Sequence, residues 1–292
     1  MKKIVMIALG LCVAASVNAQ SNEQIQNKNG KDIMPVKGEW AVGVGVSMSA
    51  VTGWVGSMFG YTGYNNVSQT YINNPAFGAT SSIFGKYMVS DNNAIRMSIS
   101  NGGTDFTNNF QTYDDRANDP DSVVTDTYRS NSSATYVSAG WEWRRGKSRL
   151  RGVYGAEAIM SWTNQHNHYS YGNALSASNP TPTANIGYWN NDYGRITEER
   201  FGATFGAGVR GFVGVEYFIA PKICIGTEFG WRAMLSQTGK SKYSYEEYDA
   251  FIENEDGSFG AIRTETIETL GSRTLSTSLD NFNTQLYFHF YF

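Results

Sequence analysis

The side chains best suited to chemistry in this sequence are two histidines, His166 and His168, which flank Asn167 and lie close to Ser170. An imidazole beside a hydroxyl or a carboxylate is the core of many hydrolase and acyltransferase sites. Two imidazoles on one face of an extended segment could also hold a metal ion. No third ligand follows at a recognisable spacing, and histidines in polar segments are often solvated. We therefore expect no catalytic or metal site, and a lipid or peptide hydrolase or acyltransferase stays as the alternative.

A glycine-rich hexapeptide, Gly206-Ala207-Gly208-Val209-Arg210-Gly211, matches the dinucleotide-binding pattern letter for letter. That pattern binds a pyrophosphate only where it follows a strand and opens a helix. Here an alternation of residue types continues from Ala203 to Val213, which favours an uninterrupted strand. We expect no cofactor, and we interpret the glycines as positions of close packing.

Carboxylates are concentrated in two polar segments, residues 114–121 and 246–256. Their spacing does not match a calcium-binding loop, so we expect solvated loops, although such density could collect the divalent cations of lipopolysaccharide. Aromatic residues accompany the second segment, and exposed aromatics beside charge are common at recognition surfaces. We predict a contact site for a surface protein or glycan partner, formed by Tyr243, Tyr245, Tyr248 and Phe251.

The N-terminus predicts export. Lys2 and Lys3 precede the apolar stretch Ile4–Ala15 and the small-residue site Val17-Asn18-Ala19, so residues 1–19 are expected to be a signal peptide. Residues 20–38 are polar, and we predict a flexible periplasmic segment. Removal of the signal changes the formal net charge from −3 to −5 and leaves Cys224 as the only cysteine. We therefore expect neither a nucleic acid partner nor an internal disulfide.

Strand-like alternation fills the remainder, residues 39–292, and short connections there alternate with long polar ones. Residues 90–93, 145–149 and 220–222 are short, whereas 52–78, 107–133, 163–201 and 236–272 are long. Short turns and long loops in turn are typical of an all-β, up-and-down antiparallel transmembrane β-barrel, here of about eight strands, with ten as the alternative. The weak alternation in Ser258–Leu270 predicts a hairpin above the membrane, without additional strands in the wall.

Charged residues fall on the strand face opposite to the apolar residues. Glu142 and Arg144, for example, alternate with Trp141 and Trp143. The predicted inward set is Lys86, Arg96, Glu142, Arg144, Arg151, Glu157, Arg210, Glu216, Glu228 and Arg232. Both signs inside a narrow lumen favour ion pairs that fill the interior. An open porin is therefore disfavoured, and a narrow channel is kept as a further alternative.

The last strand carries Leu286, Phe288, Phe290 and Phe292 on one face and mixed residues on the other. Together with the export signal, it resembles the closing strand of bacterial outer-membrane β-barrels, a family whose terminal Phe is read by the barrel assembly machinery. The mature chain resembles the transmembrane barrel of outer-membrane protein A and its small relatives. The opening Lys37-Gly38-Glu39-Trp40 resembles small barrels of Bacteroidota-type bacteria.

This resemblance implies an outer-membrane location and contact with outer-membrane lipid and lipopolysaccharide, but it implies no particular activity. We predict a non-enzymatic barrel that presents four long extracellular loops. Their expected role is surface interaction, envelope stabilisation or complex formation.

Overall fold

The computed structural model describes residues 25–26, 28–47, 81–117, 119, 121–146, 148–253, 259–279 and 285–292. The predicted signal peptide and the first predicted loop lie outside these residues. The strands are β1 (Trp40–Ser47), β2 (Ser81–Ser90), β3 (Asn93–Tyr113), β4 (Val123–Arg145), β5 (Leu150–Ser170), β6 (Trp189–Asn190), β7 (Gly194–Ala220), β8 (Ile223–Thr238), β9 (Ser241–Glu253), β10 (Phe259–Thr269), β11 (Ser272–Leu279) and β12 (Gln285–Tyr291). Within the described part of the chain, no helix has the length and apolar character needed to cross a membrane.

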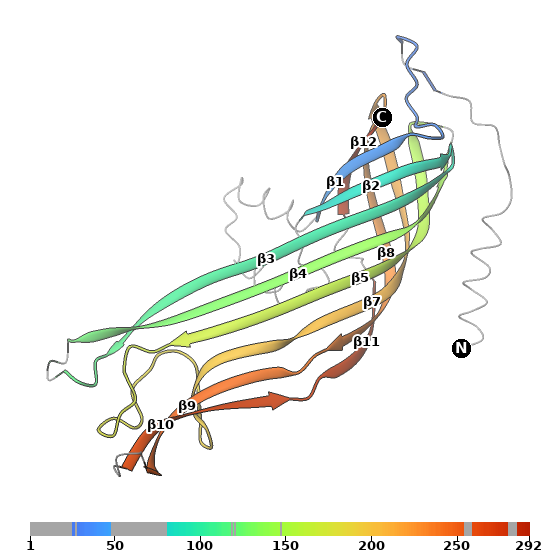
Figure 1. Ribbon diagram of the computed structural model, residues 1–292. Coiled ribbons are helices and arrows are strands. Elements are labelled where there is room, and N and C mark those ends of the chain that lie inside the picture. Colours follow the sequence, from blue (N-terminus) through green and yellow to red (C-terminus); the bar gives the residue numbers. More distant parts are fainter. Residues whose placement is uncertain are drawn as a thin grey trace.

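The strands form an antiparallel sheet that closes on itself as a barrel (Figure 1). The ring runs β1, β2, β3, β4, β5, β7, β8 and β12, and β12 pairs back with β1 from Ala41↔Tyr291 to Ser47↔Gln285. β11 and β12 lie in succession along β8, because Leu279 is opposite Trp231 and Gln285 is opposite Glu228. The predicted all-β barrel of eight strands is therefore confirmed.

The outer surface of the ring is apolar. Val209, Val213 and Phe229 are each about half exposed, and so are many of their neighbours. The wider set of exposed outward residues includes Trp40, Val42, Val44, Ile83, Ile95, Met97, Ile99, Leu150, Met160, Trp162, Phe205, Val215, Trp231 and Phe290. A continuous apolar belt of this kind is unfavourable in water and suits a hydrocarbon environment.

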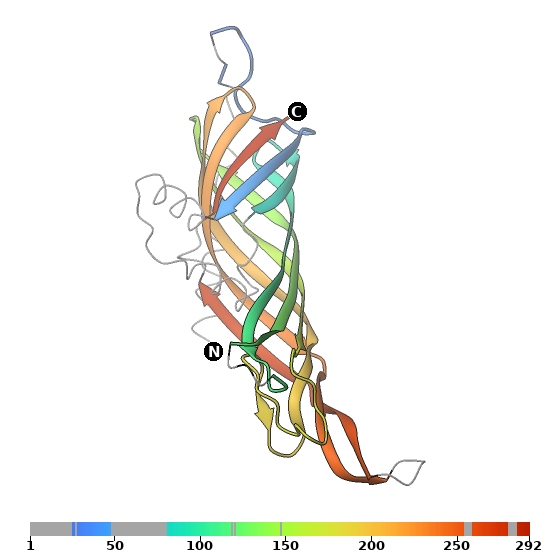
Figure 2. The same cartoon turned by 90° about the vertical axis from the view of Figure 1, so that its left-hand side faces the viewer.

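Beyond this belt the sheet continues as long strands that extend away from the ring (Figure 2). Much of segments 107–133, 163–201 and 236–272, predicted as loops, belongs to β3, β4, β5, β7, β8, β9 and β10. That prediction was wrong because the outward side chains there are polar, so no hydrophobic period marks the strands. Polar cross-strand pairs hold them together, such as Arg129 Nη2 with Asp105 Oδ2 at 2.7 Å and Asn101 Nδ2 with Thr135 Oγ1 at 2.7 Å.

The β9–β10 hairpin lies outside the closed ring. β9 pairs with the start of β7, from Arg195 to Arg200, whereas the rest of β7 pairs with β8 from Thr204 onward. β10 then pairs with β9. As predicted, the described part of this segment, residues 259–270, adds no strand to the barrel wall.

The N-terminal segment packs across one end of the barrel. Ile33 and Met34 are buried, with 0% and 2% of their surfaces exposed. The β7–β8 turn holds them, because Lys222 donates its backbone N–H to Ile33 O at 3.1 Å and its Nζ to Met34 O at 2.9 Å. We call residues 25–26 and 28–39 the N-terminal cap. Over its described part, the structure corrects the predicted flexible segment: one apolar pair is too short to show any periodicity, yet it fills the mouth of the barrel.

Candidate functional site

The part of the lumen nearest the N-terminal cap contains charged side chains from six neighbouring strands of the ring, since alternation points every second residue inward. Eight of them form one network of ion pairs, which we call the lumen network: Lys86 on β2, Arg96 on β3, Glu142 and Arg144 on β4, Glu157 on β5, Arg210 and Glu216 on β7, and Glu228 on β8. Every side chain in it is at most 5% exposed except Arg210, at 12%. Its four carboxylates and four cations balance.

Glu216 is the centre of the half of this network nearest the cap. Its Oε1 lies 2.6 Å from Lys86 Nζ, and its Oε2 accepts a hydrogen bond from Arg144 Nη2. Lys86 also lies 2.7 Å from Glu142 Oε2. One carboxylate thus joins β2, β4 and β7 across the lumen.

Arg96 is the centre of the other half. Its two terminal nitrogens donate to both oxygens of Glu228 at 2.8 and 3.0 Å, which is the bidentate geometry of a strong charge-assisted pair. Its guanidinium carbon also lies 4.1 Å from the ring centroid of Phe212. Arg210 Nη1 contacts Glu157 and Glu228, each at 2.9 Å. The fully buried arginine is therefore neutralised on one side and stacked on the other.

Arg151 and Arg232, the remaining members of the predicted inward set, occupy different positions. Arg151 is buried, and its Nη1 has no hydrogen-bond partner among the described residues. Arg232 is half-buried and lies directly opposite Arg210 across β7 and β8. The structure places both on the lumen side.

Apolar side chains pack between the lumen network and the N-terminal cap, and they close this end of the lumen. The buried cluster there comprises Ile33, Met34, Ala41, Met88, Ala94, Phe218, Cys224 and Tyr291. The first two residues come from the N-terminal cap and the others from the ring. Ion pairs and this apolar layer together fill the lumen near the N-terminal cap.

The glycine-rich hexapeptide lies in the middle of β7, as the alternation predicted, and opens no helix. A Cβ atom on Gly208 would lie 2.2 Å from Ala233 O, and one on Gly206 would lie 2.6 Å from Ser161 Oγ. These glycines therefore permit close approach of neighbouring strands and side chains.

The two histidines lie on β5, beyond the apolar belt, and not in a loop. His166 Nε2 lies 2.7 Å from Glu198 Oε1, which also accepts a hydrogen bond from Arg200, while His168 is exposed. Burial raises the pKa of Glu198, but the bonds from Arg200 and His166 outweigh it and hold that pKa below its ordinary value. Among the described residues, no hydroxyl is hydrogen-bonded to either imidazole. This is the geometry of a hydrogen bond between an imidazole and a carboxylate at the surface.

A buried polar cluster on the lumen-facing side of the distal strands was missed by the sequence analysis. Glu199 Oε2 accepts hydrogen bonds from Asn167 Nδ2 and Tyr169 Oη, both at 2.8 Å, and Ser130 Oγ donates to Asn167 Oδ1 at 2.8 Å. These residues are opposite one another only through the β4–β5–β7 register. No local pattern in the sequence could have linked them.

The predicted contact residues on β9 differ in how far they are exposed. Tyr245 is 5% exposed, and its ring packs against Tyr188 and Tyr193. Its prediction as a contact residue was wrong, because the 171–193 connection folds back over β9. Tyr243 packs against Phe201, and Tyr248 is half-buried. Phe251, in contrast, is 90% exposed and available to a partner.

The acidic segments are also ordered where the structure describes them. On β9, Glu246 pairs with Arg195 at 2.8 Å and Glu247 with Arg263 at 3.2 Å. In the other segment, Asp115 Oδ2 accepts hydrogen bonds from Asn179 Nδ2 and Thr183 N. Burial raises the pKa of Asp115, and these bonds more than offset it, so its pKa lies below the ordinary value. The expected solvated loops are instead tied to neighbouring segments.

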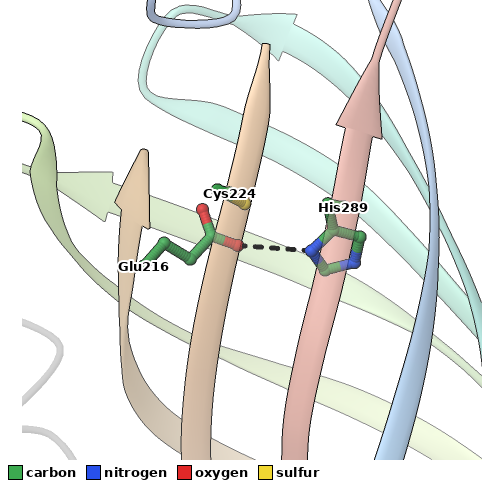
Figure 3. A group of neighbouring side chains, drawn as sticks. All are labelled: Glu216, Cys224 and His289. Atoms are coloured by element: carbon green, nitrogen blue, oxygen red, sulfur yellow. Dashed lines mark ion pairs between the residues drawn. The ribbon is translucent and has the colours of Figure 1, made fainter. Parts of the chain in front are cut away.

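One group of side chains could hold a metal ion. Glu216, Cys224 and His289 are buried on β7, β8 and β12, and one ligand atom of each lies within 4.8 Å of the others (Figure 3). The sequence analysis considered a metal at His166 and His168. It did not single out Glu216, Cys224 and His289, which lie on three strands that only the folded barrel brings together.

Comparisons with known proteins show only a distant likeness. No protein-family model matches the chain, and no curated protein matches it in sequence. Among solved structures, it is similar to a major outer membrane protein from Thermus thermophilus. The identity is 8% and the TM-score 0.34, with 87% of this chain and 99% of that chain covered. We draw no conclusion about function from so distant a similarity.

Proposed function

We propose that the protein is a non-enzymatic β-barrel of the bacterial outer membrane whose lumen is closed and whose distal strands contact a partner protein. The observation that carries the proposal is the lumen network. Its buried ion pairs connect opposite walls of the ring. The apolar cluster and the N-terminal cap close the adjacent end of the lumen. A barrel filled in this way acts as an anchor and not as a conduit.

The outer-membrane location is supported by the exposed apolar belt around a closed antiparallel ring. A ring satisfies all of its backbone hydrogen bonds internally, as a membrane requires. The C-terminal row adds to this: Phe290 and Phe292 are exposed, whereas Tyr287, His289 and Tyr291 are buried. This split is what a lipid-facing closing strand needs.

The partner contact is supported by the end of the β9–β10 hairpin. Phe251, Phe259 and Ile262 are 90%, 66% and 53% exposed there, away from the closed ring. β10 pairs only with β9 among the described strands, so it has a free edge. Large exposed apolar side chains beside a free strand edge suit a protein partner that adds a strand.

Planar bilayer recordings test the closed lumen. The purified full chain is expected to show no large steady conductance after reconstitution, because passage would require breaking buried ion pairs. An open porin in the same bilayer serves as the positive control. A stable, ion-selective conductance from the unmodified protein would contradict the closed barrel and favour the narrow channel.

Limited proteolysis of intact cells tests the orientation. A protease that cleaves after aromatic residues is expected to cut near Phe251 and Phe259, since both lie at the exposed hairpin end. Trypsin is expected to spare the β4–β5 turn at Arg145–Arg149, which should face the periplasm. Permeabilised cells provide the control for accessibility of that turn. Cleavage at Arg145–Arg149 in sealed cells would show that the barrel is inverted.

A further inference from the structure

The buried imidazole of His289 has no hydrogen-bond partner in the described part of the chain. Its side chain is 1% exposed, and neither Nδ1 nor Nε2 forms a hydrogen bond there. Its Nδ1 lies 3.7 Å from Glu216 Oε1, too far for a hydrogen bond. Leaving a buried polar group without a hydrogen bond is unfavourable. A neutral imidazole nitrogen in this state is ready to bind a ligand.

A thiol lies directly beside it. Cys224 on β8 is opposite His289 on β12 in the strand register and is fully buried. Figure 3 shows both side chains next to Glu216 on β7. Two thioethers, Met34 from the N-terminal cap and Met88 from β2, belong to the same buried apolar cluster as Cys224, and Met88 Sδ accepts a hydrogen bond from Arg144 Nη1 at 3.3 Å. A thiol and an imidazole therefore lie side by side in the lumen near the N-terminal cap.

We infer that Cys224 and His289 hold a monovalent copper ion, Cu(I), between β8 and β12. Thiolate, thioether and imidazole are the ligands that this soft ion prefers. Binding forms a copper–sulfur bond and a copper–nitrogen bond and breaks the S–H bond of Cys224. The released proton passes to the solvent, and no electron is transferred.

The charge balance of the lumen distinguishes Cu(I) from Zn²⁺. Glu216 and Glu142 are already neutralised by Lys86 and Arg144. Exchange of the thiol proton for Cu(I) leaves this balance unchanged, whereas exchange for Zn²⁺ adds one positive charge in a buried space. An uncompensated buried charge is strongly unfavourable. Glu216 therefore stays with its two cations and is not required as a ligand.

A competition titration tests the inference. The full chain, folded in detergent micelles under anaerobic conditions, is titrated with Cu(I) acetonitrile complex against the chromophoric chelator bicinchoninate. Because the N-terminal cap covers the site, a second sample is refolded from urea with Cu(I) present. One equivalent of Cu(I) is expected to stay with the protein, with sulfur and nitrogen neighbours in copper X-ray absorption. Zn²⁺ under the same conditions should not be retained.

Three variants sharpen the test. Cys224→Ser and His289→Phe are expected to lose the retained equivalent. The phenylalanine should preserve the packing of His289 against Phe84 and Tyr287. Met97→Leu, which changes an exposed outward methionine, is the matched control and should bind as the parent does. Folding of each variant is checked by its heat-dependent shift on gels.

The inference would be overturned if the folded Cys224→Ser variant retained Cu(I). It would also be overturned if the parent protein retained no Cu(I) in either sample. One equivalent of Zn²⁺ lost with the same two variants would overturn the assignment of a monovalent ion. Either result would leave the proposed closed barrel untouched.

Discussion

Replacement of Glu216 by glutamine is expected to lower the free energy of unfolding by about 3 to 5 kcal/mol, the usual loss when one partner of a buried ion pair is removed. Glu216 contacts Lys86 and Arg144 in a space that water does not reach, since all three side chains are at most 2% exposed. The amide cannot neutralise the two cations. Urea unfolding in lipid vesicles and the heat-dependent gel shift measure the loss.

The pair Asp105–Arg129 supplies the matched control. Its ion pair has a similar distance, 2.7 Å, but its side chains are 43% and 61% exposed. Asp105→Asn is expected to cost less than about 1 kcal/mol, because water replaces the lost contact. If both variants lose the same small amount, the lumen must be open to water at Glu216, and the closed barrel would be refuted.

Deletion of Phe292, or its replacement by aspartate, is expected to reduce the amount of folded barrel in the outer membrane several-fold. Phe292 is 71% exposed and ends the apolar row of β12, and its backbone pairs with Trp40 in both directions. The side chain therefore contributes little to packing inside the barrel. Because Phe292 resembles the recognition signal of outer-membrane barrels, we expect the substitution to impair assembly of the barrel. Quantification of heat-modifiable protein in isolated membranes measures it.

Tyr291→Phe is the companion variant. Tyr291 is 5% exposed and packs against Phe218 and Arg144, yet its hydroxyl has no hydrogen-bond partner among the described residues. Loss of that hydroxyl keeps the packing and should leave assembly unchanged. Equal losses from Tyr291→Phe and Phe292→Asp would argue against an outward-facing assembly signal.

The sequence alone determined the barrel and the face of each strand within the apolar belt. A period of two is a local property, so Trp141, Glu142, Trp143 and Arg144 indicate their own directions without knowledge of any partner. Turns such as residues 90–93 then limit how consecutive strands can pair. Alternation and turn spacing together predicted eight antiparallel strands, which the ring confirms.

Where the outward residues become polar, the same reasoning failed. In the distal parts of β3 and β4 the strands are held by bonds such as Arg129 to Asp105 and Thr127 to Asn109. A polar side chain gives no sign of whether its partner is water or a neighbouring strand. Strands therefore appeared as loops, and His166 and His168 were placed in one of them.

The tertiary structure alone decided which groups meet. Glu216 reaches Lys86 and Arg144 from positions 130 and 72 residues away, and this requires closure of the ring. Closure also sets Cys224 opposite His289, through the pairing of β8 with β12. Ile33 and Met34 are buried only because the finished barrel offers an apolar mouth to cover. Contacts between distant segments depend on register, and register is a property of the folded sheet.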